Sequence, residues 1–360
     1  MRIATFNLEN LFTRPSVFAV GSSPEGRQAI QDFDRLNRII AKAVYDAQDR
    51  AFLLEASQRH GFHQLNAPPL AFVRLQKIRG QLFSSAGGNL QVAAGGRDEW
   101  TGWFELRRDN VGWEALRNTA QVVEAVAADV LVCVEVEDRL TLERFNRQVL
   151  DPAHRYPHAM LIDGNDSRGI DVGLLSRHPI RAMVSHIDDP GANGERVFSR
   201  DCPEYDLELP GGETLVVIPN HFKSKRGGDS AASRERRRRQ GERAHEIART
   251  ALARSPLVLV AGDLNDTPDS EALQEVLSDG FADVQAHPDY PTDRPGTFGT
   301  GLARDKIDYL IQSPQLGARL RTTGLERRGT YHPQLWASFP GVTADTEASD
   351  HHALWADFDL

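Results

Sequence analysis

Short apolar segments alternate with longer amphipathic ones along most of the chain. Apolar residues at helical spacing predict helices over residues 115–126 and 244–252. Runs rich in Val, Ile and Leu predict strands, several of them buried on both faces, at residues 3–6, 130–134, 172–175, 215–218, 257–260, 307–311 and 353–358. Strands that alternate with amphipathic helices predict a layered α/β protein.

The segment from about residue 14 to residue 110 departs from this alternation. Phe33, Leu36, Ile40, Val44 and Ala47 form one apolar stripe at helical spacing, and a glycine-rich stretch follows at residues 87–96. The pattern indicates no strand here, and neither an internal repeat nor a flexible linker divides the chain. We therefore expect one domain over residues 1–360, with a largely helical insertion at about 14–110.

Composition narrows the class of protein. Hydrophobic residues make up 40% of the 360 positions and charged residues 26%, which is typical of a globular protein and excludes a disordered or collagen-like chain. Cys133 and Cys202 are the only cysteines, so a disulfide framework and a four-cysteine zinc site are excluded. We find no apolar run that could span a membrane and no export signal, and we expect a cytoplasmic protein.

Charge is unevenly distributed. The formal net charge is −9, yet residues 223–249 hold ten Lys or Arg and four Asp or Glu, a local charge of +6. Lys223 and Lys225 directly follow a predicted strand and could attract an anionic substrate. The arginines between residues 234 and 239 are more typical of a solvated helix face.

Polar side chains gather where the predicted strands end, and this is where α/β proteins build their sites. The set contains carboxylates, amides and imidazoles, but no thiolates: Asn7 and Glu9, Glu135, Asp171, Asn220 and His221, Asp263 and Asn265, Asp308, Asp350 and His351. Hard oxygen ligands favour Mg²⁺ or Mn²⁺, with Ca²⁺ as an alternative. Imidazoles add groups that hold or move a proton near neutral pH. The combination predicts phosphoester hydrolysis.

Six short motifs occur in a characteristic order: Thr-Phe-Asn-Leu-Glu-Asn at residue 5, Val-Glu-Val-Glu-Asp at 134, Asn-His-Phe-Lys-Ser-Lys at 220, Gly-Asp-Leu-Asn-Asp at 262, Lys-Ile-Asp-Tyr at 306 and Ser-Asp-His-His at 349. As a set they resemble the endonuclease/exonuclease/phosphatase superfamily, to which deoxyribonuclease I belongs. The resemblance covers residues 1–13 and about 111–360. It implies a four-layer α/β sandwich, in which two packed mixed sheets are flanked by helices.

The resemblance also implies roles for individual positions. Glu135 is expected to bind the metal directly, with Asn7 and Asp350 beside it. The catalytic group comprises Asp263 to orient or deprotonate water, Asn265 to hold a phosphate oxygen, the dyad of Asp308 and His351, and His221, oriented by Asp171, to contact phosphate or act as an acid. The expected substrate-binding residues are Arg200, Lys223 and Arg168.

Each of these residues has a plainer interpretation. A single carboxylate at a strand end often only caps a turn, and a single histidine is often structural. The ordered set of motifs favours the functional interpretation. We expect His352 to be structural, and Glu9 and Glu137 to be solvated or to lie behind the direct ligands. Arg168 precedes a glycine turn, where simple exposure is the alternative.

These features favour a divalent-metal-dependent phosphodiester hydrolase, namely a nuclease whose partner is nucleic acid, with no obligate protein partner. One alternative is a phosphatase or lipid phosphodiesterase of the same superfamily, acting on an inositol phosphate or a sphingomyelin-like head group, because loops rather than the fold choose the substrate. Another is a noncatalytic binding module. Such a module is expected to lose motif residues, and the main positions are all present here.

Overall fold

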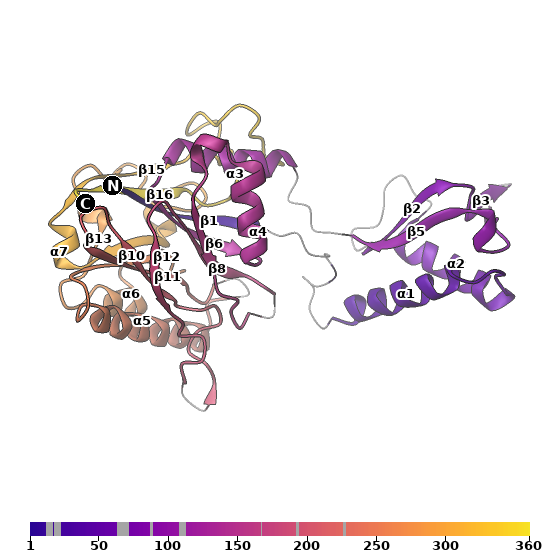
Figure 1. Cartoon of the computed structure of the whole chain (residues 1–360), viewed down its shortest axis with the longest axis horizontal. Coiled ribbons are helices and arrows are strands. Elements are labelled where there is room, and N and C mark those ends of the chain that lie inside the picture. Colours follow the sequence, from indigo (N-terminus) through magenta and orange to yellow (C-terminus); the bar gives the residue numbers. More distant parts are fainter. Residues whose placement is uncertain are drawn as a thin grey trace. The chain divides into compact units, whose positions relative to one another are not determined.

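The larger of two compact units carries most of the chain. The computed structural model describes residues 1–11, 17, 23–62, 72–86, 89–107, 113–166, 168–191, 194–225 and 228–360. The larger unit comprises Met1–Phe12 and Val111–Leu360, and the smaller comprises Thr13–Asn110 (Figure 1). That the smaller unit is an insertion into a single functional domain stays a prediction.

Two six-stranded mixed sheets form the centre of the larger unit. In the first sheet the order is β15 (Leu320–Glu326), β16 (Ala353–Phe358), β1 (Arg2–Leu11), β6 (Val130–Val136), β8 (Asp171–Ser176) and β7 (His158–Leu161). In the second it is β13 (Ala282–Asp283), β14 (Asp308–Gln312), β12 (Leu257–Asp263), β11 (Thr214–His221), β10 (Glu204–Glu208) and β9 (Ile180–Val184). Each sheet contains one parallel pair, β1 with β6 and β11 with β12, among antiparallel neighbours.

Successive side chains of each strand point to opposite faces of its sheet, so each sheet packs against the other sheet on one face and against helices on the other. Ile3 of β1 packs between the two sheets with Val217 of β11, whereas Ala4 and Phe6 face outward. The outer face of the first sheet is covered by α3 (Trp113–Val126) and α4 (Arg139–Arg144), and that of the second by α5 (Ala231–Ala251) and α6 (Glu271–Val276) (Figure 1). The predicted four-layer sandwich is confirmed.

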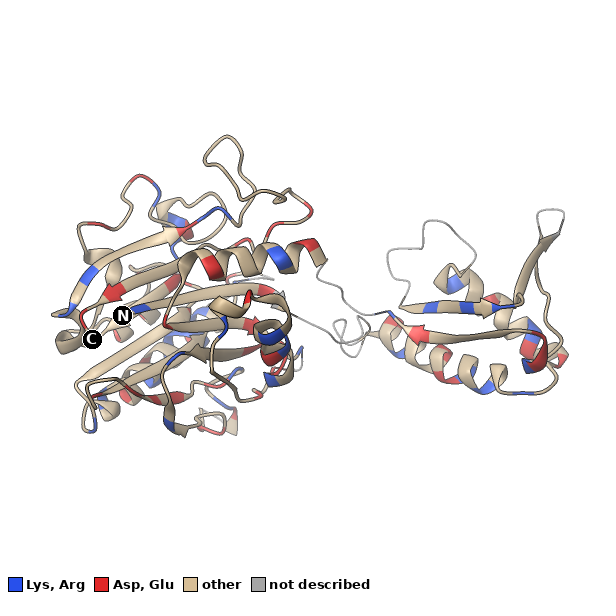
Figure 2. Cartoon of the chain, turned by 45° about the horizontal axis from the view of Figure 1, so that its top comes forward, with Lys and Arg blue, Asp and Glu red and all other residues tan. Residues whose placement is uncertain are grey.

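Shorter elements complete the larger unit. They are α7 (Pro314–Gly317), the π-helical turn η3 (Phe145–Val149) and the 3₁₀ turns η4 (Pro152–His154), η6 (Val284–Ala286) and η7 (Ala303–Asp305). In the described ranges, no helix is both long and apolar enough to cross a membrane. Residues of both charge signs are spread over both units (Figure 2), as expected of a solvated surface.

All seven predicted strands are present, and so are the two helices predicted in this unit. The sequence missed β7, β9, β10, β13 and β15. β9 is half-buried at one residue and exposed along the rest, so it carries no apolar alternation. β13 is only two residues long. Such strands are defined by the neighbour they pair with, which the local sequence does not reveal.

The smaller unit contains strands as well as helices. Its helices are α1 (Pro24–Ile40) and α2 (Ala47–His60), and β2 (Val73–Arg79) pairs with β5 (Thr101–Leu106) while β3 (Phe83–Ala86) pairs with β4 (Asn89–Val92); η2 (Arg97–Glu99) is a 3₁₀ turn. Leu36, Leu53 and Trp100 lie in its core. The expectation of no strand here was wrong, because most residues of these strands are polar or only half-buried.

The apolar stripe predicted over residues 33–47 is also interrupted. α1 ends at Ile40, and Asp46 caps a new helix by accepting a hydrogen bond from the Asp49 backbone amide. Val44 lies in the turn between the helices and is 74% exposed. Helical spacing alone therefore predicted one helix where the structure has two.

One arginine of α5 contradicts the predicted solvated face. Arg237 is fully buried, and its Nε donates to Asp266 Oδ2 at 2.7 Å while its guanidinium also pairs with Asp229. It joins the start of α5 to the loop after β12. A buried charge is tolerated when it is paired in this way.

Strand register brings the polar strand ends to one edge. His221 pairs with Asp263 across the parallel strands β11 and β12, and Asp263 pairs with Asp308 across the antiparallel strands β12 and β14. Parallel strands contribute their carboxyl ends here, and antiparallel neighbours contribute their amino ends. His351 is two residues before β16 begins, at the same edge of the first sheet.

Gly262 directly precedes Asp263 in β12 and has a left-handed backbone, φ 135°; a Cβ at this position would come within 2.0 Å of the Asn220 backbone oxygen. We expect Gly262→Ala to lower the free energy of unfolding by about 1–3 kcal/mol through this overlap. Urea denaturation measures the change. Gly211→Ala is the matched control, because no atom lies within 4 Å of its Cβ position. Equal stability of the two variants would contradict the argument.

Candidate active site

A pocket of about 570 Å³ lies at the edge where the strand ends meet. Its lining includes six of the predicted catalytic and metal-binding residues. The complete set is Glu9, Glu135, His221, Ser224, Lys225, Asp263, Asn265, Phe298, Arg304, Asp305, Ile307, Asp350 and His351. Asn7 and Asp308 lie directly behind this lining, bonded to Asp263 and His351. Residues far apart in the sequence thus form one largely acidic pocket.

Asp308 and His351 form a buried pair. His351 Nδ1 donates to Asp308 Oδ2 at 2.8 Å, and Asp308 is fully buried. Burial disfavours a charged imidazole, but the charge and hydrogen bond of Asp308 outweigh it and raise the pKa of His351 to about 10. His351 therefore holds a proton at neutral pH. Its Nε2 faces Asp263 and Asp350, at 3.9 and 3.7 Å from their carboxylate oxygens.

Asp263 occupies the centre of the pocket. Asn7 Nδ2 donates to Asp263 Oδ2 at 3.2 Å, and the Asn265 backbone amide donates to Oδ1 at 2.9 Å. Burial and the nearby charge of Asp308 raise the pKa of Asp263 to about 7. A carboxylate with this pKa can take up a proton near neutral pH.

His221 faces the same centre from β11. Its Nε2 is 3.9 Å from Glu135 Oε1 and 3.8 Å from Asp263 Oδ2. Burial, followed by the positive charges of Arg200 and His351, holds the pKa of His221 well below its usual range. His221 is therefore neutral at pH 7.

Asp171 does not make the expected contact with His221. Asp171 Oδ1 accepts a hydrogen bond from the Gly164 backbone amide at 2.8 Å, and burial raises its pKa to about 7. His221 Nδ1 has no hydrogen-bond partner among the described residues. Asp171 starts β8 opposite Val136, so it stands behind the pocket rather than in its lining.

Glu9 is a pocket residue that sequence reasoning undervalued. Its Oε2 accepts a hydrogen bond from the Asp350 backbone amide at 3.0 Å. Partial burial and the negative charge of Asp350 raise the pKa of Glu9 to about 7. Its position two residues after Asn7, in the motif that begins at residue 5, was the signal available in the sequence. The structure adds that the register of β1 with β6 is irregular between Asn7 and Leu11. By contrast, His352 is buried against Trp336, as expected of a structural residue.

Left-handed backbone is concentrated at this pocket. Five described non-glycine residues have positive φ, and three of them are Glu9 (46°), Glu135 (63°) and Asn265 (54°). Such conformations cost free energy and persist where the surrounding structure enforces them, commonly at functional sites. Here they occur at three polar residues that line the pocket: Glu9 in β1, Glu135 in β6 and Asn265, which follows β12.

The donor atoms fit a hard divalent cation. Asp263, Asp308 and His351 have side-chain atoms that all lie within 4.8 Å of one another, but a protonated His351 has no free lone pair, so the carboxylates are the donors for a cation. Glu135 and Asp350 add further carboxylate oxygens to the pocket lining. Burial, and after it neighbouring negative charge, raise the pKa values of Asp263 and Glu9, and a bound cation would favour the charged forms of both carboxylates.

The three predicted substrate-binding residues line a neighbouring pocket of about 380 Å³. Arg200 is 2% exposed, and its Nη2 lies 3.0 Å from Asp166 Oδ2. Arg168 pairs with the same carboxylate at 2.8 Å. Lys223 completes the basic side, and Ser224 belongs to the lining of both pockets. The structure therefore sets these cations beside the acidic pocket rather than within it.

Comparison with known proteins places this arrangement in a family. The model of the Endonuclease/Exonuclease/phosphatase family matches residues 110–351. No curated protein matches the chain.

Solved structures show the same fold. A family protein from Bacteroides thetaiotaomicron has a TM-score of 0.51 and 17% identity, covering 69% of this chain and 91% of its own. An endonuclease/exonuclease/phosphatase from Beutenbergia cavernae has a TM-score of 0.50 and 19% identity, covering 67% and 65%. Truncated TDP2 from Caenorhabditis elegans has a TM-score of 0.48 and 21% identity, covering 68% and 89%. At these identities the likeness is one of fold alone.

The family match spans more than half of the chain and includes the whole second sheet, together with β6, β7, β8 and β15 of the first. β1, which carries Asn7 and Glu9, and β16 lie outside the matched residues. Members of this family are metal-dependent phosphoesterases that hydrolyse phosphodiester bonds. The resemblance found in the sequence is confirmed, and the chain belongs to the endonuclease/exonuclease/phosphatase family, as a metal-dependent phosphoesterase.

Proposed function

We propose that this protein is a nuclease that hydrolyses phosphodiester bonds of nucleic acid. One observation supports the proposal above all others: the acidic pocket around Asp263 adjoins a basic pocket lined by Arg168, Arg200 and Lys223. The first suits a cation and a reacting phosphate. The second suits the negative charge of a polyanion that continues beyond that phosphate. The cytoplasmic location and the lack of an obligate protein partner stay predictions.

The proposed roles follow from the contacts of each residue. Asp263 orients the attacking water and takes its proton, since its pKa is near 7. His351, kept protonated by Asp308, and Asn265 donate hydrogen bonds to phosphate oxygens as negative charge develops on them. Neutral His221 contacts the phosphate from the side of Glu135. Asp171 supports the adjoining loop through Gly164.

Glu135, Asn7 and Asp350 are the residues that we propose hold the cation, which is Mg²⁺ or Mn²⁺, with Ca²⁺ as an alternative. When bound, such a cation neutralises negative charge on the reacting phosphate and the leaving oxygen. Arg200, Arg168 and Lys223 bind the substrate away from the cleaved bond.

Removal of divalent cations is expected to abolish activity, and added Mg²⁺ or Mn²⁺ is expected to restore it. Glu135→Gln removes a negatively charged ligand, so the Mg²⁺ concentration for half-maximal activity should rise about tenfold or more. The measurement is a metal titration of the rate. Glu137→Gln is the control, because Glu137 is outside the pocket lining. Full activity in excess chelator would contradict the metal assignment.

Asp263→Asn and His351→Asn are each expected to lower kcat by about 10²–10³-fold. Asparagine at 263 keeps an acceptor for Asn7, and asparagine at 351 can still donate to Asp308, so both variants should fold. Circular dichroism and thermal unfolding check the fold, and steady-state kinetics check the loss. Asp345→Asn, at an exposed loop position in the same segment as His351, is the control. Wild-type turnover in either pocket variant would refute its proposed role.

A substrate panel tests the nuclease assignment directly. Plasmid DNA, single-stranded DNA, RNA, bis(4-nitrophenyl) phosphate, inositol phosphates and sphingomyelin are compared with Mg²⁺ or Mn²⁺. We expect nucleic acid to have the highest kcat/KM, and this value to fall steeply with added salt because phosphate contacts release counterions. Preferential turnover of an inositol phosphate or of sphingomyelin would favour the alternative phosphoesterases. No turnover of any substrate would favour a binding module.

A further inference from the structure

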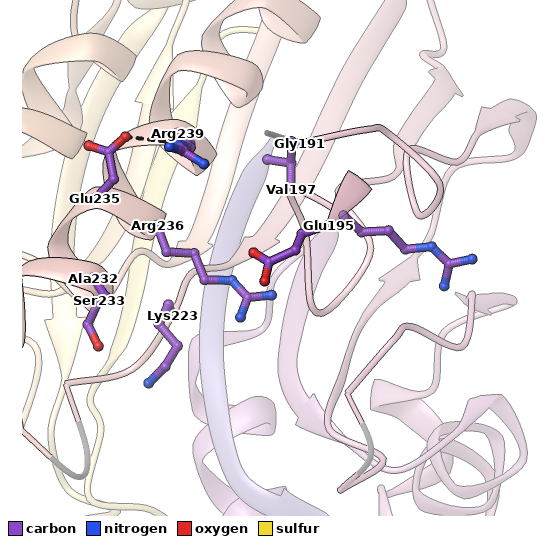
Figure 3. A pocket seen from close by; sticks show the side chains of 10 residues that line it. Gly191, Glu195, Val197, Lys223, Ala232, Ser233, Glu235, Arg236 and Arg239 are labelled. Carbon is purple, nitrogen blue, oxygen red and sulfur yellow. Dashed lines mark hydrogen bonds and ion pairs between the residues drawn. The ribbon is translucent and has the colours of Figure 1, made fainter. Parts of the chain in front are cut away.

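Three pockets of the larger unit are contiguous. The acidic pocket shares Ser224 with the basic pocket of Arg168 and Arg200. The basic pocket in turn shares Lys223 and Arg236 with a third pocket of about 360 Å³. The third pocket lies between the first turns of α5 and the loop before β10 (Figure 3). The three pockets therefore adjoin one another in series through shared lining residues.

Arg236 differs from its neighbours on α5. Six other arginines of this helix have a carboxylate partner within 4.0 Å: Arg234, Arg237, Arg238, Arg239, Arg243 and Arg249. For Arg236 the described residues provide no such partner. Figure 3 shows its side chain reaching toward the centre of the pocket, whereas Arg239 is turned to Glu235. Arg236 is thus an exposed cation that no carboxylate of the described residues neutralises.

Lys223 faces the same two pockets from the end of β11. Its Nζ donates to the Ser224 backbone oxygen at 2.6 Å, and none of the described carboxylates lies within ion-pair distance. Burial and the positive charges of Arg200 and Arg168 hold its pKa below the usual value. The neighbouring cations therefore repel one another, and an anion would remove this repulsion.

Acidic residues do not neutralise this position. Glu235 lines the third pocket but is engaged by Arg238 and Arg239. Glu195 also lines it, and within the described chain it makes no ion pair with Lys223 or Arg236. In the adjoining basic pocket, the Nε atom of buried Arg200 has no hydrogen-bond partner among the described residues. Beside the acidic pocket, Lys223, Arg236 and the Nε atom of Arg200 therefore have no anionic or hydrogen-bonding partner for part of their donor capacity among the described residues.

We propose that Lys223 and Arg236 form a binding site for a second phosphate of the substrate, next to the phosphate that is hydrolysed. This inference rests on the proposed nuclease function and deepens it. The preferred substrate is then a strand that carries at least two phosphates, and a single isolated diester is a poor one. Arg236 is a specificity residue, since it acts on a phosphate that does not react.

Arg236→Gln and its matched control Arg239→Gln test the site. Both arginines are on α5 and line the third pocket, but Arg239 is already paired with Glu235. Kinetics are measured on a short oligothymidylate and on bis(4-nitrophenyl) phosphate. We expect Arg236→Gln to raise KM for the oligonucleotide by a factor about ten times larger than its effect on KM for bis(4-nitrophenyl) phosphate. The kcat for the oligonucleotide should be retained. For the oligonucleotide, the slope of log(kcat/KM) against the logarithm of the salt concentration should become less steep by about 0.7.

Two results would overturn the proposal. One is an equal effect of Arg236→Gln and Arg239→Gln on the oligonucleotide. The other is an equal loss on both substrates, which would place Arg236 at the reacting phosphate instead.

A second measurement separates this proposal from the nuclease assignment. Thymidine 5′-monophosphate and thymidine 3′,5′-bisphosphate are compared as inhibitors of bis(4-nitrophenyl) phosphate hydrolysis. We expect the bisphosphate to bind about tenfold more tightly to the wild type and to Arg239→Gln, and this preference to vanish in Arg236→Gln. An unchanged preference in Arg236→Gln refutes the second site even if nucleic acid is cleaved. A lost preference without cleavage of nucleic acid supports the site and refutes the nuclease.

Discussion

The register of three neighbouring strands is the constraint on which the candidate site depends. Pairing across β11, β12 and β14 sets His221, Asp263 and Asp308 in one row of the second sheet. A slip of one residue would turn each side chain to the opposite face, so the apolar alternation that fills the core also fixes the chemistry at the edge. The first sheet, held against the second by the shared core, supplies Asn7 and Glu135.

Electrostatics at this edge oppose stability. Burial raises the pKa of Asp263, Asp171 and Glu9 to about 7, which means that the folded protein disfavours their charged forms. Left-handed backbone at Glu135 and Asn265 adds strain. These costs are offset by the large apolar layers on both faces of each sheet. An acidic pocket of this kind is consistent with a family whose chemistry uses a cation.

The arginines of α5 are of two kinds: most pair with acidic residues of the protein, and one remains able to bind an external anion. Arg237 is buried and fixes the helix to the loop after β12 through Asp266, while other arginines of the helix pair with acids three or four residues away. Arg236 and Lys223 face the pockets without such partners in the described structure. A strongly basic sequence segment therefore contributes only a small part of its charge to recognition.

The sequence by itself determined the layered α/β class, the seven buried strands and the family, because apolar periodicity and ordered motifs are local properties of the chain. It missed the edge strand β9 and the strands of the smaller unit, whose half-exposed residues carry no such pattern. Only the tertiary structure decided that Asp171 bonds Gly164 and that Glu9 enters the pocket. The same holds for the burial of Arg237 beside Arg236, which has no ion-pair partner in the part of the chain that the structure describes. Those outcomes depend on which side chains meet across strands and helices distant in the chain, and spacing along a sequence does not encode such distances.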